Sequence, residues 1–369
     1  MKNIYLDNAA TMPVYSEVVK EMEKTMIDNY GNPSSTHELG EKARIEIDNA
    51  RKVIARELGG RAEEIIFTSG ATESNNLAIL GLAKANNGVK KKIIISSIEH
   101  SSVLEVCEAL KAEGYEIVEI PVDKEGFVGL KRLEEEIDSK TLLVSVIHAN
   151  NEIGVLQDLR KIGALCKRKG VLFHTDAVQS FGRERINVRD FGIDLLSASG
   201  HKIGGPKGIG FLFIRQGVDI KPIMYGGGQE RWLRVGTENV PGIAGFAKAL
   251  EITKKIDEEK VRKVRDYFMI ELEKMGGKIN GSREKRAAGN VHVSFSGLDA
   301  DYAVIKLSQK GIMCSTGSAC ESKRKGEKRI LKAIGLNEKE IAGSLRFGLR
   351  EGTGKKDIDF VVGEIGKIV

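Results

Sequence analysis

Seven short apolar runs between residues 63 and 214 constrain the fold of this 369-residue chain most strongly. They read EEIIFT, KKIIISS, YEIVEIPV, TLLVSVIHA, VLFHTDA, IDLLSAS and GIGFLFI, and most are rich in β-branched residues. Amphipathic stretches such as ESNNLAILGLAKA and SSVLEVCEALKAEG separate several of them. Continuous apolar strands that alternate with helices predict an α/β fold whose mostly parallel, seven-stranded sheet is covered on both faces.

The strand spacing changes near residue 250, where a long helical pattern begins. Shorter apolar runs, NVHVSFSG, IMCSTGSAC and GSLRFGLR, then alternate with helical stretches and predict a smaller α+β domain. A chain of this length is expected to hold more than one domain. We expect a large domain at residues 14–250 and a small domain formed by residues 1–13 and 251–369.

Composition narrows the classes of function. The net charge is +6 and only 5% of residues are aromatic, and most basic residues are mixed with acidic ones, so direct nucleic-acid binding is not expected. No apolar run is long enough to span a bilayer, and the polar N-terminus lacks a signal sequence, so we expect a cytoplasmic protein without membrane contact. Four cysteines without a C-x-x-C pair indicate neither a disulfide framework nor a metal site.

Polar residues follow several of the predicted strands. The turn SGATESNN opens a helix whose first backbone N–H groups could bind an anion. The pairs Glu99-His100 and Asn150-Asn151 follow two further strands, and Asp176 ends another. Lys202 lies in the glycine-rich joint SASGHKIGGPKG. Each feature alone also fits a helix cap, a structural polar group or a surface lysine, but such groups meet in the crevice beyond the carboxyl ends of parallel strands.

Together these residues match the needs of pyridoxal phosphate. That cofactor needs a lysine amine for its aldehyde, a carboxylate for its pyridine nitrogen, donors for its phenolate oxygen, a phosphate site, and a flat group on its ring. Lys202 could supply the amine and Asp176 the carboxylate, while Asn151 and Gln179 could donate to the phenolate oxygen. Thr72, Ser199 and His201 could bind the phosphate, and His100 could stack on the ring. The sequence has no Walker-type motif or dinucleotide fingerprint, which disfavours other phosphate cofactors.

An ordered set of motifs spans essentially the whole chain. It comprises YLDNAAT, GNPSSTH, FTSGATESNN, IEHSSV, NNEIGV, HTDAVQS, SGHKIGGPKGIG, GGGQE, GTENVPG, STGSAC and LRFGLR. The set resembles the NifS/IscS-type cysteine desulfurases, which belong to the class V aminotransferase group of fold-type I pyridoxal-phosphate enzymes. The resemblance implies that Lys202 carries the cofactor and that Asp176 contacts its pyridine nitrogen. It further implies that His100 stacks on the ring and moves protons.

The resemblance also assigns the remaining cofactor contacts. Ala71, Thr72, Ser199 and His201 would bind the phosphate, and Asn151 and Gln179 would bind the phenolate oxygen. Thr237 would reach the phosphate of the neighbouring subunit's cofactor, which implies a homodimer with composite active sites. Arg346 and Asn151 would hold the carboxylate of the substrate.

Cys320 is the cysteine placed for reactivity. Its neighbours are small and polar, and five of the seven residues from Lys323 to Arg329 are basic, which favours a thiolate. Cys107 and Cys166 lie in amphipathic stretches and are expected to pack as core residues, and Cys314 is expected to be packed as well. The resemblance implies that Cys320 attacks the sulfur of the substrate and carries it as a persulfide.

The expected catalytic residues are therefore Lys202, Cys320 and His100. The expected reaction converts L-cysteine to L-alanine and passes sulfur to an acceptor protein, for iron–sulfur cluster assembly or transfer-RNA thiolation. One alternative is a selenocysteine lyase or another pyridoxal-phosphate aminotransferase, which needs Lys202 and Asp176 but not Cys320. Another is a non-catalytic sulfur carrier or basic partner-binding protein.

Overall fold

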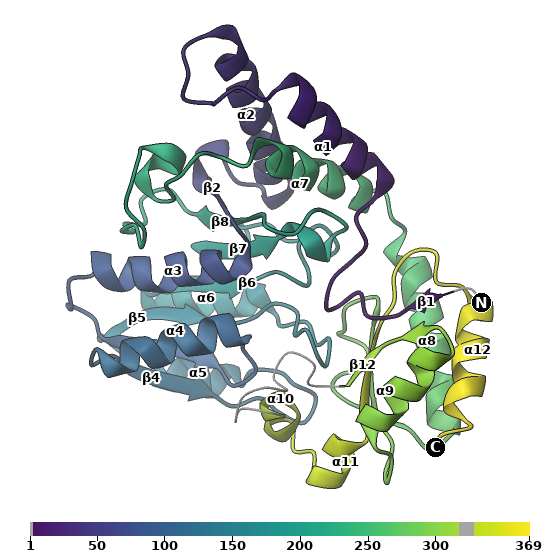
Figure 1. The fold of residues 1–369 in the computed structure, drawn as a ribbon. Coiled ribbons are helices and arrows are strands. Elements are labelled where there is room, and N and C mark those ends of the chain that lie inside the picture. The colour runs from purple at the N-terminus through teal and green to yellow at the C-terminus, as the bar shows by residue number, and fades with distance from the viewer. Residues whose placement is uncertain (1–2, 317–327) are drawn as a thin grey trace.

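The seven predicted strands form one sheet in the order β2-β8-β7-β6-β5-β3-β4 (Figure 1). Their bounds are β2 Ile65–Thr68, β3 Lys92–Ser96, β4 Glu116–Ile120, β5 Thr141–Ser145, β6 Leu172–Asp176, β7 Leu195–Ser199 and β8 Gly210–Ile214. Only β8 runs antiparallel to its neighbours, so the other six strands point the same way. The computed structural model describes residues 3–316 and 328–369, and it confirms the expected α/β fold.

Helices cover both faces of this sheet. Helices α3 (Ala71–Ala85) and α4 (Ser101–Ala112) lie on one face, whereas α2 (Glu38–Leu58), α5 (Leu130–Glu136), α6 (Leu159–Lys169) and α7 (Val240–Thr253) lie on the other. Because successive strand residues point to opposite faces, Ile94 packs in the core under α6, whereas Ile93 and Ile95 pack under α3 and α4. Helix α1 (Ser16–Asp28) packs on α7, away from the sheet (Figure 1).

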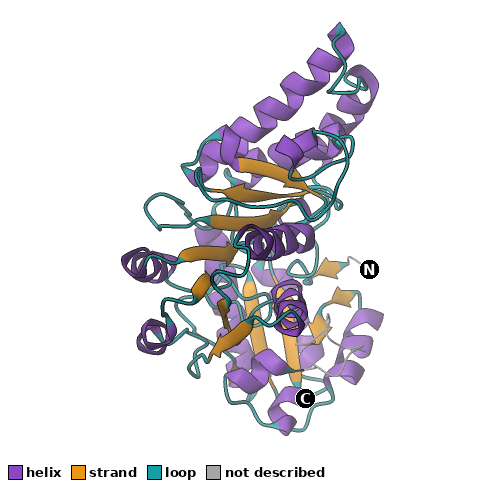
Figure 2. Ribbon diagram, turned by 90° about the vertical axis from the view of Figure 1, so that its left-hand side faces the viewer, coloured by secondary structure: helices purple, strands orange, loops and turns teal. Residues whose placement is uncertain are grey.

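A second, smaller unit lies beside the large sheet (Figures 1 and 2). Its antiparallel sheet has the order β12-β13-β10-β9, and β1 pairs with β11 in parallel. The strands are β1 Ile4–Tyr5, β9 Lys278–Ile279, β10 Asn290–Ser294, β11 Ile312–Met313, β12 Ser315–Thr316 and β13 Ser344–Gly348, and the main helices are α8 Glu258–Lys274, α9 Ala300–Gln309 and α12 Lys355–Ile365. Ile4 and Leu6 share its apolar core with Phe268 and Phe347, so the first residues of the chain pack beside the last hundred.

Two short helices join the units. Helices α10 (Arg329–Ala333) and α11 (Glu338–Ala342) form an apolar cluster with the loops that follow β3 and β5. In that cluster Ile330 and Leu331 pack with Ile98 and Ile147. The cluster therefore lies at the carboxyl edge of the large sheet, where the polar strand ends also meet. Within residues 3–316 and 328–369, no helix has the length and apolarity needed to cross a membrane.

Candidate active site

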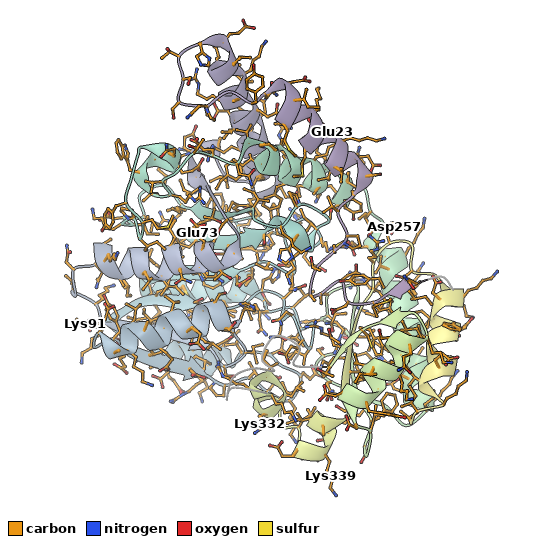
Figure 3. The ribbon with its side chains drawn as sticks, in the orientation of Figure 1. Glu23, Glu73, Lys91, Asp257, Lys332 and Lys339 are labelled. Carbon is orange, nitrogen blue, oxygen red and sulfur yellow. The ribbon has the colours of Figure 1, made fainter. Side chains whose placement is uncertain are left out.

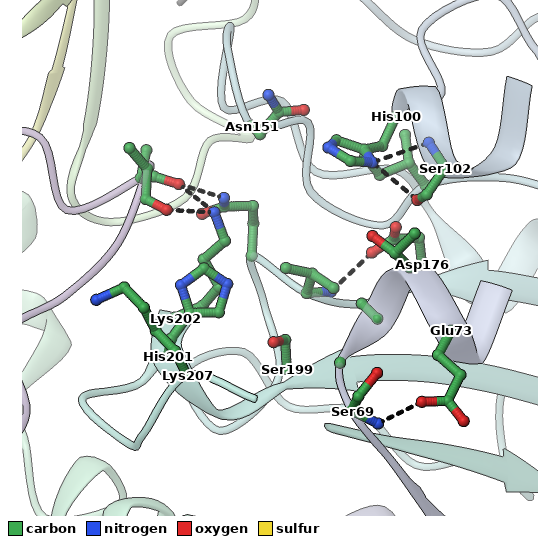
Figure 4. A pocket seen from close by; sticks show the side chains of 18 of the residues that line it. Ser69, Glu73, His100, Ser102, Asn151, Asp176, Ser199, His201, Lys202 and Lys207 are labelled. Atoms are coloured by element: carbon green, nitrogen blue, oxygen red, sulfur yellow. Dashed lines mark hydrogen bonds between the residues drawn. The ribbon is translucent and has the colours of Figure 1, made fainter. Parts of the chain in front are cut away.

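A cavity of about 430 Å³ opens at the carboxyl edge of the large sheet (Figure 4). Loops after β2, β3, β5, β6 and β7 supply most of its wall, while β13 and the segment after β1 supply the rest. It is lined by Ala9, Ala10, Ser69, Gly70, Ala71, Thr72, Glu73, His100, Ser102, Ile147, Asn151, Asp176, Val178, Gln179, Ser199, His201, Lys202, Lys207, Gly208 and Arg346. Among the described residues, every site residue expected from the sequence except Thr237 lines this cavity.

Lys202 ends a single 3₁₀ turn, Gly200–Lys202, directly after β7. Its Nζ donates to the backbone carbonyl oxygens of Ala9 at 2.7 Å and Ala10 at 2.8 Å, so the amine lies inside the crevice rather than on the open surface (Figure 4). Gly204, two positions after Lys202, must be a glycine for the chain to turn here. Its φ is +77°, and a Cβ at this position would overlap the Tyr15 ring. The tight joint thus turns the chain immediately after Lys202.

Asp176 is a buried carboxylate at the end of β6. Its Oδ2 accepts a hydrogen bond from Asn75 Nδ2 at 2.9 Å, and its Oδ1 accepts one from the backbone N–H of Val178 at 3.0 Å. Two fixed donors therefore hold the carboxylate in one orientation. Each oxygen keeps a further lone pair for a cationic N–H in the cavity.

The two histidines of the cavity are held neutral. His100 caps α4, where its Nδ1 accepts from Ser102 N at 3.1 Å. Burial lowers the pKa of His100, and nearby Lys202 lowers it further, against the opposing effect of Asp176. Burial likewise lowers the pKa of His201 to about 4, helped by the charges of Lys202 and Lys207. Neutral imidazoles can donate one hydrogen bond and accept another.

One end of the cavity offers donors to an anion. Helix α3 begins there with Ala71 and Thr72, and Ser199 and His201 lie on the same wall (Figure 4). Backbone N–H groups at a helix N-terminus, together with hydroxyls and an imidazole, suit a phosphate. Lys207 also lines the cavity, although its place in the glycine-rich joint carried no predicted role.

Arg346 brings a positive charge into the cavity from β13, and its side chain is only 2% exposed. Its Nη2 donates to Asp7 Oδ1 at 3.0 Å, and its Nη1 donates to the carbonyl oxygen of Asn151 at 3.3 Å. Within the described part of the chain, Arg346 Nε and Asn151 Oδ1 are buried without hydrogen-bond partners. Unsatisfied buried groups of opposite kind, lining one cavity, indicate that a polar ligand completes the site.

The donor set therefore fits pyridoxal phosphate. The cavity combines a lysine amine, an anchored carboxylate, neutral imidazoles and a helix N-terminus, which are the groups that this cofactor requires. The unpartnered side-chain oxygen of Asn151 and the buried guanidinium of Arg346 leave polar capacity for an amino acid beside it.

Several site residues escaped the sequence analysis. Asn75 and Ser102 connect Asp176 to His100, Asp7 pairs with Arg346, and the carbonyl oxygens of Ala9 and Ala10 hold Lys202. Ser102 follows His100 by two positions at a helix start, which in sequence reads only as a capping residue. Asp7, Ala9 and Ala10 stand in the motif YLDNAAT, but the motif predicted no role for them, because their roles depend on contacts between distant segments.

Three of the four cysteines are described, and they are packed as predicted. Cys107, Cys166 and Cys314 are buried, and burial raises the pKa of each thiol to about 12, so none is a ready thiolate. Cys320 lies outside the described residues. Both flanks of its segment adjoin the cavity, because Ser315 pairs with Arg346 across β12 and β13, and Ile330 packs near Ile147.

The basic run from Lys323 to Arg329 is described only at its end. Arg329 donates to Glu119 Oε2 at 2.7 Å, which ties the start of α10 to β4. Beyond it, Lys332 on α10 and Lys339 on α11 lie at the lower edge of the molecule in Figure 3. Lys332 Nζ pairs with Glu338 Oε1 at 2.8 Å, so basic and acidic side chains are mixed on these two helices.

Thr237 lies on an exposed segment and does not line the cavity of its own chain. The segment is tied to the cavity mouth by Arg234, whose Nε contacts Glu73 Oε1 at 3.0 Å. Glu73 in turn accepts from Ser69 N at 2.6 Å at the start of α3 (Figures 3 and 4).

Comparisons with known proteins show the family of the chain. Residues 4–361 match the family described as Aminotransferase class-V. The chain is 45% identical to the cysteine desulfurase IscS of Methanosarcina thermophila, over 100% of this chain and 92% of that protein, and 42% identical to the cysteine desulfurase IscS of Dictyoglomus turgidum, over 100% and 95%. Among solved structures, a NifS-like protein superposes with a TM-score of 0.94 at 36% identity, covering 100% of this chain and 99% of the other. A structure of SspA in complex with cysteine has a TM-score of 0.85 at 37% identity, over 94% and 98%.

Proposed function

The chain belongs to the cysteine desulfurases of the class-V aminotransferase family, and from this premise we propose which residues carry the reaction and which partners it serves. It is a pyridoxal-phosphate enzyme that converts L-cysteine to L-alanine and transfers the sulfur. In this reaction the Cβ–S bond of cysteine breaks, an S–S bond forms with a thiol, and the proton of that thiol balances the new C–H bond of alanine. The product on the accepting thiol is a persulfide.

The cofactor would be held by Lys202, by Asp176 and by the hydrogen-bond donors at the N-terminus of α3. Pyridoxal phosphate, when bound, supplies an aldehyde for an amine and a ring that withdraws the electrons left at Cα. Lys202 would carry it covalently, and Asp176 would keep a proton on its pyridine nitrogen. Thr72, Ser199 and His201 would bind its phosphate, with the backbone N–H of Ala71, and Asn151 and Gln179 would contact its phenolate oxygen.

Arg346 and Asn151 would bind and orient the substrate. The buried guanidinium of Arg346 attracts a carboxylate, and the low polarity around it strengthens the attraction. Once Lys202 Nζ is released, it can take a proton from Cα of the substrate and return it. The carbonyl oxygens of Ala9 and Ala10 would hold the resulting ammonium, since they accept from Nζ at 2.7 and 2.8 Å.

Cys320 would take the sulfur. The other three cysteines are buried thiols with raised pKa values, which leaves Cys320 as the candidate nucleophile. The flanks of its segment adjoin Arg346 and Ile147, and this supports delivery of its thiolate to a substrate held by Arg346. The basic residues from Lys323 to Arg329 would favour the thiolate form.

One observation supports this proposal most directly: Lys202, Asp176, His100 and Arg346 line a single cavity although they come from four different strands or loops. The test is to incubate the purified holoenzyme with L-cysteine and quantify alanine and persulfide together. We expect equal amounts in a single turnover without reductant, and loss of both products in Cys320→Ser. Cysteine turnover at an unchanged rate in Cys320→Ser would instead indicate a selenocysteine lyase or another enzyme that needs no cysteine nucleophile.

We further propose a homodimer in which Thr237 of one subunit completes the phosphate site of the other. Three consecutive residues, Glu230, Arg231 and Trp232, adopt left-handed backbone conformations, which is strained for side chains of this kind. The strained turn exposes Trp232 and lies with α2 around a hollow of about 600 Å³. Further apolar side chains are exposed on and just after α1, on α2 and in the segment before this turn, and they support burial by a second copy; they are Val19, Met26, Ile27, Tyr30, Ile45, Met224 and Tyr225.

The sulfur acceptor is proposed to be a protein of iron–sulfur cluster assembly or transfer-RNA thiolation. The relatives named IscS support a role in sulfur supply. The three described cysteines are free thiols, which supports the reducing conditions of a cytoplasmic location. Transfer of ³⁵S from labelled cysteine to candidate acceptors tests the acceptor, and cell fractionation tests the location.

The domain division is proposed at residues 14–250 for the large domain, and at 1–13 with 251–369 for the small one. Separate apolar cores support it, because Leu6 and Phe347 belong to one core and Ile94 and Phe246 to another. Limited proteolysis should cut near residue 255 before it cuts either core.

A further inference from the structure

The segment of residues 229–238, called here the Thr237 segment, begins with an unusual turn. Glu230, Arg231 and Trp232 have φ angles of +41°, +57° and +66°, a left-handed conformation that residues with a Cβ seldom adopt. Three such residues in a row persist only where surrounding contacts hold them. The side chain of Glu230 makes contacts of this kind.

Glu230 is a buried carboxylate that is paired with Arg51 of α2. Arg51 Nη1 donates to Glu230 Oε2 at 2.8 Å, and Nη2 donates to Oε1 at 2.6 Å. The two side chains are only 3% and 11% exposed, and the guanidinium lies over the ring of Phe67, 4.8 Å from its centroid. A bidentate pair that is shielded from water fixes the position of both side chains.

The same ion pair also covers the edge of the large sheet. Strand β2 lies at that edge, with β8 as its neighbour. On its outer side, Phe67 N donates to Glu230 Oε2 at 2.8 Å, and Arg51 Nη1 donates to the carbonyl oxygen of Ile65 at 2.6 Å. Backbone groups of an edge strand thus obtain side-chain partners. The turn is therefore tied to the strand that leads into α3, whose N-terminus lines the cavity.

A second contact holds the Thr237 segment at the start of α3 itself. Arg234 Nε donates to Glu73 Oε1 at 3.0 Å, and Glu73 Oε2 accepts from Ser69 N at 2.6 Å (Figure 4). The side chains of Arg234 and Glu73 are 23% and 15% exposed, so water screens this pair only in part. The segment is thus anchored at two places on one strand–helix unit.

Thr237 follows these two anchors directly. Gly236 N donates to Gln229 Oε1 at 3.0 Å, which closes the loop around the strained turn. Thr237 is exposed and stands three residues after Arg234. A hydroxyl on an exposed loop binds a ligand well only if the loop is already in place, because ordering a loop on binding costs conformational entropy.

We propose that Glu230, held by Arg51, and Arg234 are positioning residues that fix the Thr237 segment, so that Thr237 is presented to the cofactor phosphate of the neighbouring subunit. This inference rests on the proposed homodimer with composite sites, and it names the residues that make the contact between subunits possible. Their effect is delivered through Thr237, so it falls on the site of the neighbouring subunit. Loss of either anchor therefore weakens cofactor binding in the partner rather than in the subunit that carries the substitution.

Mixed dimers with one competent site test this directly. One subunit carries Lys202→Ala, so Lys202 of its partner is the only one in the dimer, and the Lys202→Ala subunit supplies Thr237 to that site. Mixed holo dimers, isolated through two affinity tags, are equilibrated with a series of pyridoxal phosphate concentrations and reduced with borohydride. Peptide mass spectrometry of the cofactor on Lys202 then gives the affinity of this one site without any turnover.

Glu230→Ala is placed on each subunit in turn. On the Lys202→Ala subunit it should weaken cofactor binding about tenfold, as expected when one hydrogen bond to a charged group is lost. On the subunit that keeps Lys202 it should leave the affinity unchanged, because that site takes Thr237 from the other chain. Equal weakening in both arrangements, which general damage to the fold would cause, overturns the proposal, and so does an unchanged affinity in both.

Arg234→Ala provides a second, milder variant, because it leaves the buried pair of Glu230 and Arg51 intact. It should show the same asymmetry even if Glu230→Ala lowers the yield of folded dimer. Weakening only from the subunit that keeps Lys202 would mean that Arg234 serves its own site through Glu73, which contradicts the proposal. Glu63→Ala is the matched control, since Glu63 is an exposed acid that lines the same hollow as Glu230, and it should leave the affinity unchanged in both arrangements.

Thr237→Ala in the same two arrangements separates this inference from the proposed function. If Thr237→Ala on the Lys202→Ala subunit weakens binding but Glu230→Ala and Arg234→Ala do not, the composite site stands and the two anchors are wrongly assigned. If Thr237→Ala on that subunit has no effect, the composite site itself is wrong, and the role of the anchors is wrong with it.

Discussion

Arg346 and Asp7 form an ion pair of 3.0 Å between β13 and the segment that follows β1. The guanidinium is almost fully buried, whereas the carboxylate is 21% exposed. Arg346 Nε has no partner in the described parts of the chain. The pair thus balances the charge of the arginine and leaves one of its donors, Nε, without a partner among the described residues.

Loss of Asp7 should destabilise the protein in a way that a carboxylate ligand reverses. Asp7→Ala leaves the Arg346 charge buried without a counter-ion, at a cost of roughly 1–3 kcal/mol. L-alanine, whose carboxylate would bind Arg346, should therefore raise the Tm of the variant more than that of the wild type. Thermal unfolding with and without L-alanine measures the difference. Glu251→Ala, which breaks an exposed ion pair with Lys248, is the matched control and should shift Tm little. If L-alanine raises the Tm of the wild type and of Asp7→Ala equally, the proposed role of Asp7 is wrong.

Removal of Lys202 should abolish both cofactor attachment and desulfuration. Lys202→Ala deletes the amine that donates to the carbonyl oxygens of Ala9 and Ala10. Reduction with borohydride followed by peptide mass spectrometry should find the cofactor on Lys202 in the wild type and on no lysine in the variant. Lys207→Ala serves as the comparison, since it should retain the covalent cofactor. Cofactor trapped on Lys207 would show that the wrong lysine had been assigned.

Substitution of Asp176 should slow the chemistry without preventing cofactor binding. Asp176→Asn removes the negative charge beside the cavity while keeping an oxygen for the N–H of Val178. Without that charge the pyridine nitrogen is protonated less often, so we expect kcat to fall by roughly 10²-fold or more. Alanine formation by the variant at saturating cofactor is the measurement. A kcat within twofold of the wild type would remove Asp176 from the site.

The sequence alone was enough to predict those cavity residues that directly follow parallel strands. Parallel strands deliver their carboxyl ends to one edge, so the positions of His100, Asn151, Asp176 and Lys202 after successive strands are enough to group them. Their chemistry then indicated the cofactor. The resemblance to cysteine desulfurases added Arg346, which no strand pattern indicated and which β13 does bring to the cavity.

The rest of the site depends on contacts between distant segments. Asp7 and Arg346 are separated by 339 positions, and no local pattern pairs them. Ala9 and Ala10 act through backbone carbonyl oxygens, so their side chains carry no information about that role. Packing and side-chain rotamers, rather than periodicity, decide these contacts.

Glu99 should make the stability of the protein depend on pH. Burial raises its pKa to about 8, although its Oε1 accepts from Ile147 N at 2.7 Å and bonds to Ser96. The unfolded chain releases this proton near its ordinary pKa of 4.5, whereas the folded chain keeps it up to about pH 8. The stabilisation is therefore complete below about pH 4.5 and is lost as the pH rises through about 8.

Glu99→Gln, a neutral isostere, should remove this dependence. Denaturant unfolding at several pH values should show the variant gaining stability relative to the wild type as the pH rises from 5 to 8.5. A difference in unfolding free energy that stays constant over this range would mean that Glu99 is already ionised in the folded protein.

If the proposed composite site is correct, a mixed dimer of two defective variants should regain one working site. Thr237→Ala removes a proposed phosphate contact from the neighbouring site, so its homodimer should bind the cofactor about tenfold more weakly, as expected for one hydrogen bond to a charged group. Lys202→Ala should be inactive. In a mixed dimer of the two variants, one site has the Lys202 of one subunit and the Thr237 of its partner, and is therefore complete.

Co-expression of the two variants with different affinity tags isolates the mixed dimer. At limiting cofactor it should show about half the activity of the wild type, with wild-type cofactor affinity in its single competent site. If Thr237 instead contacted the cofactor of its own subunit, the one site of the mixed dimer that has Lys202 would lack Thr237. The mixed dimer would then bind the cofactor as weakly as the Thr237→Ala homodimer does. Because Thr237 does not line the cavity of its own chain, whereas Arg234 ties its segment to Glu73 at the cavity mouth, we expect the first result.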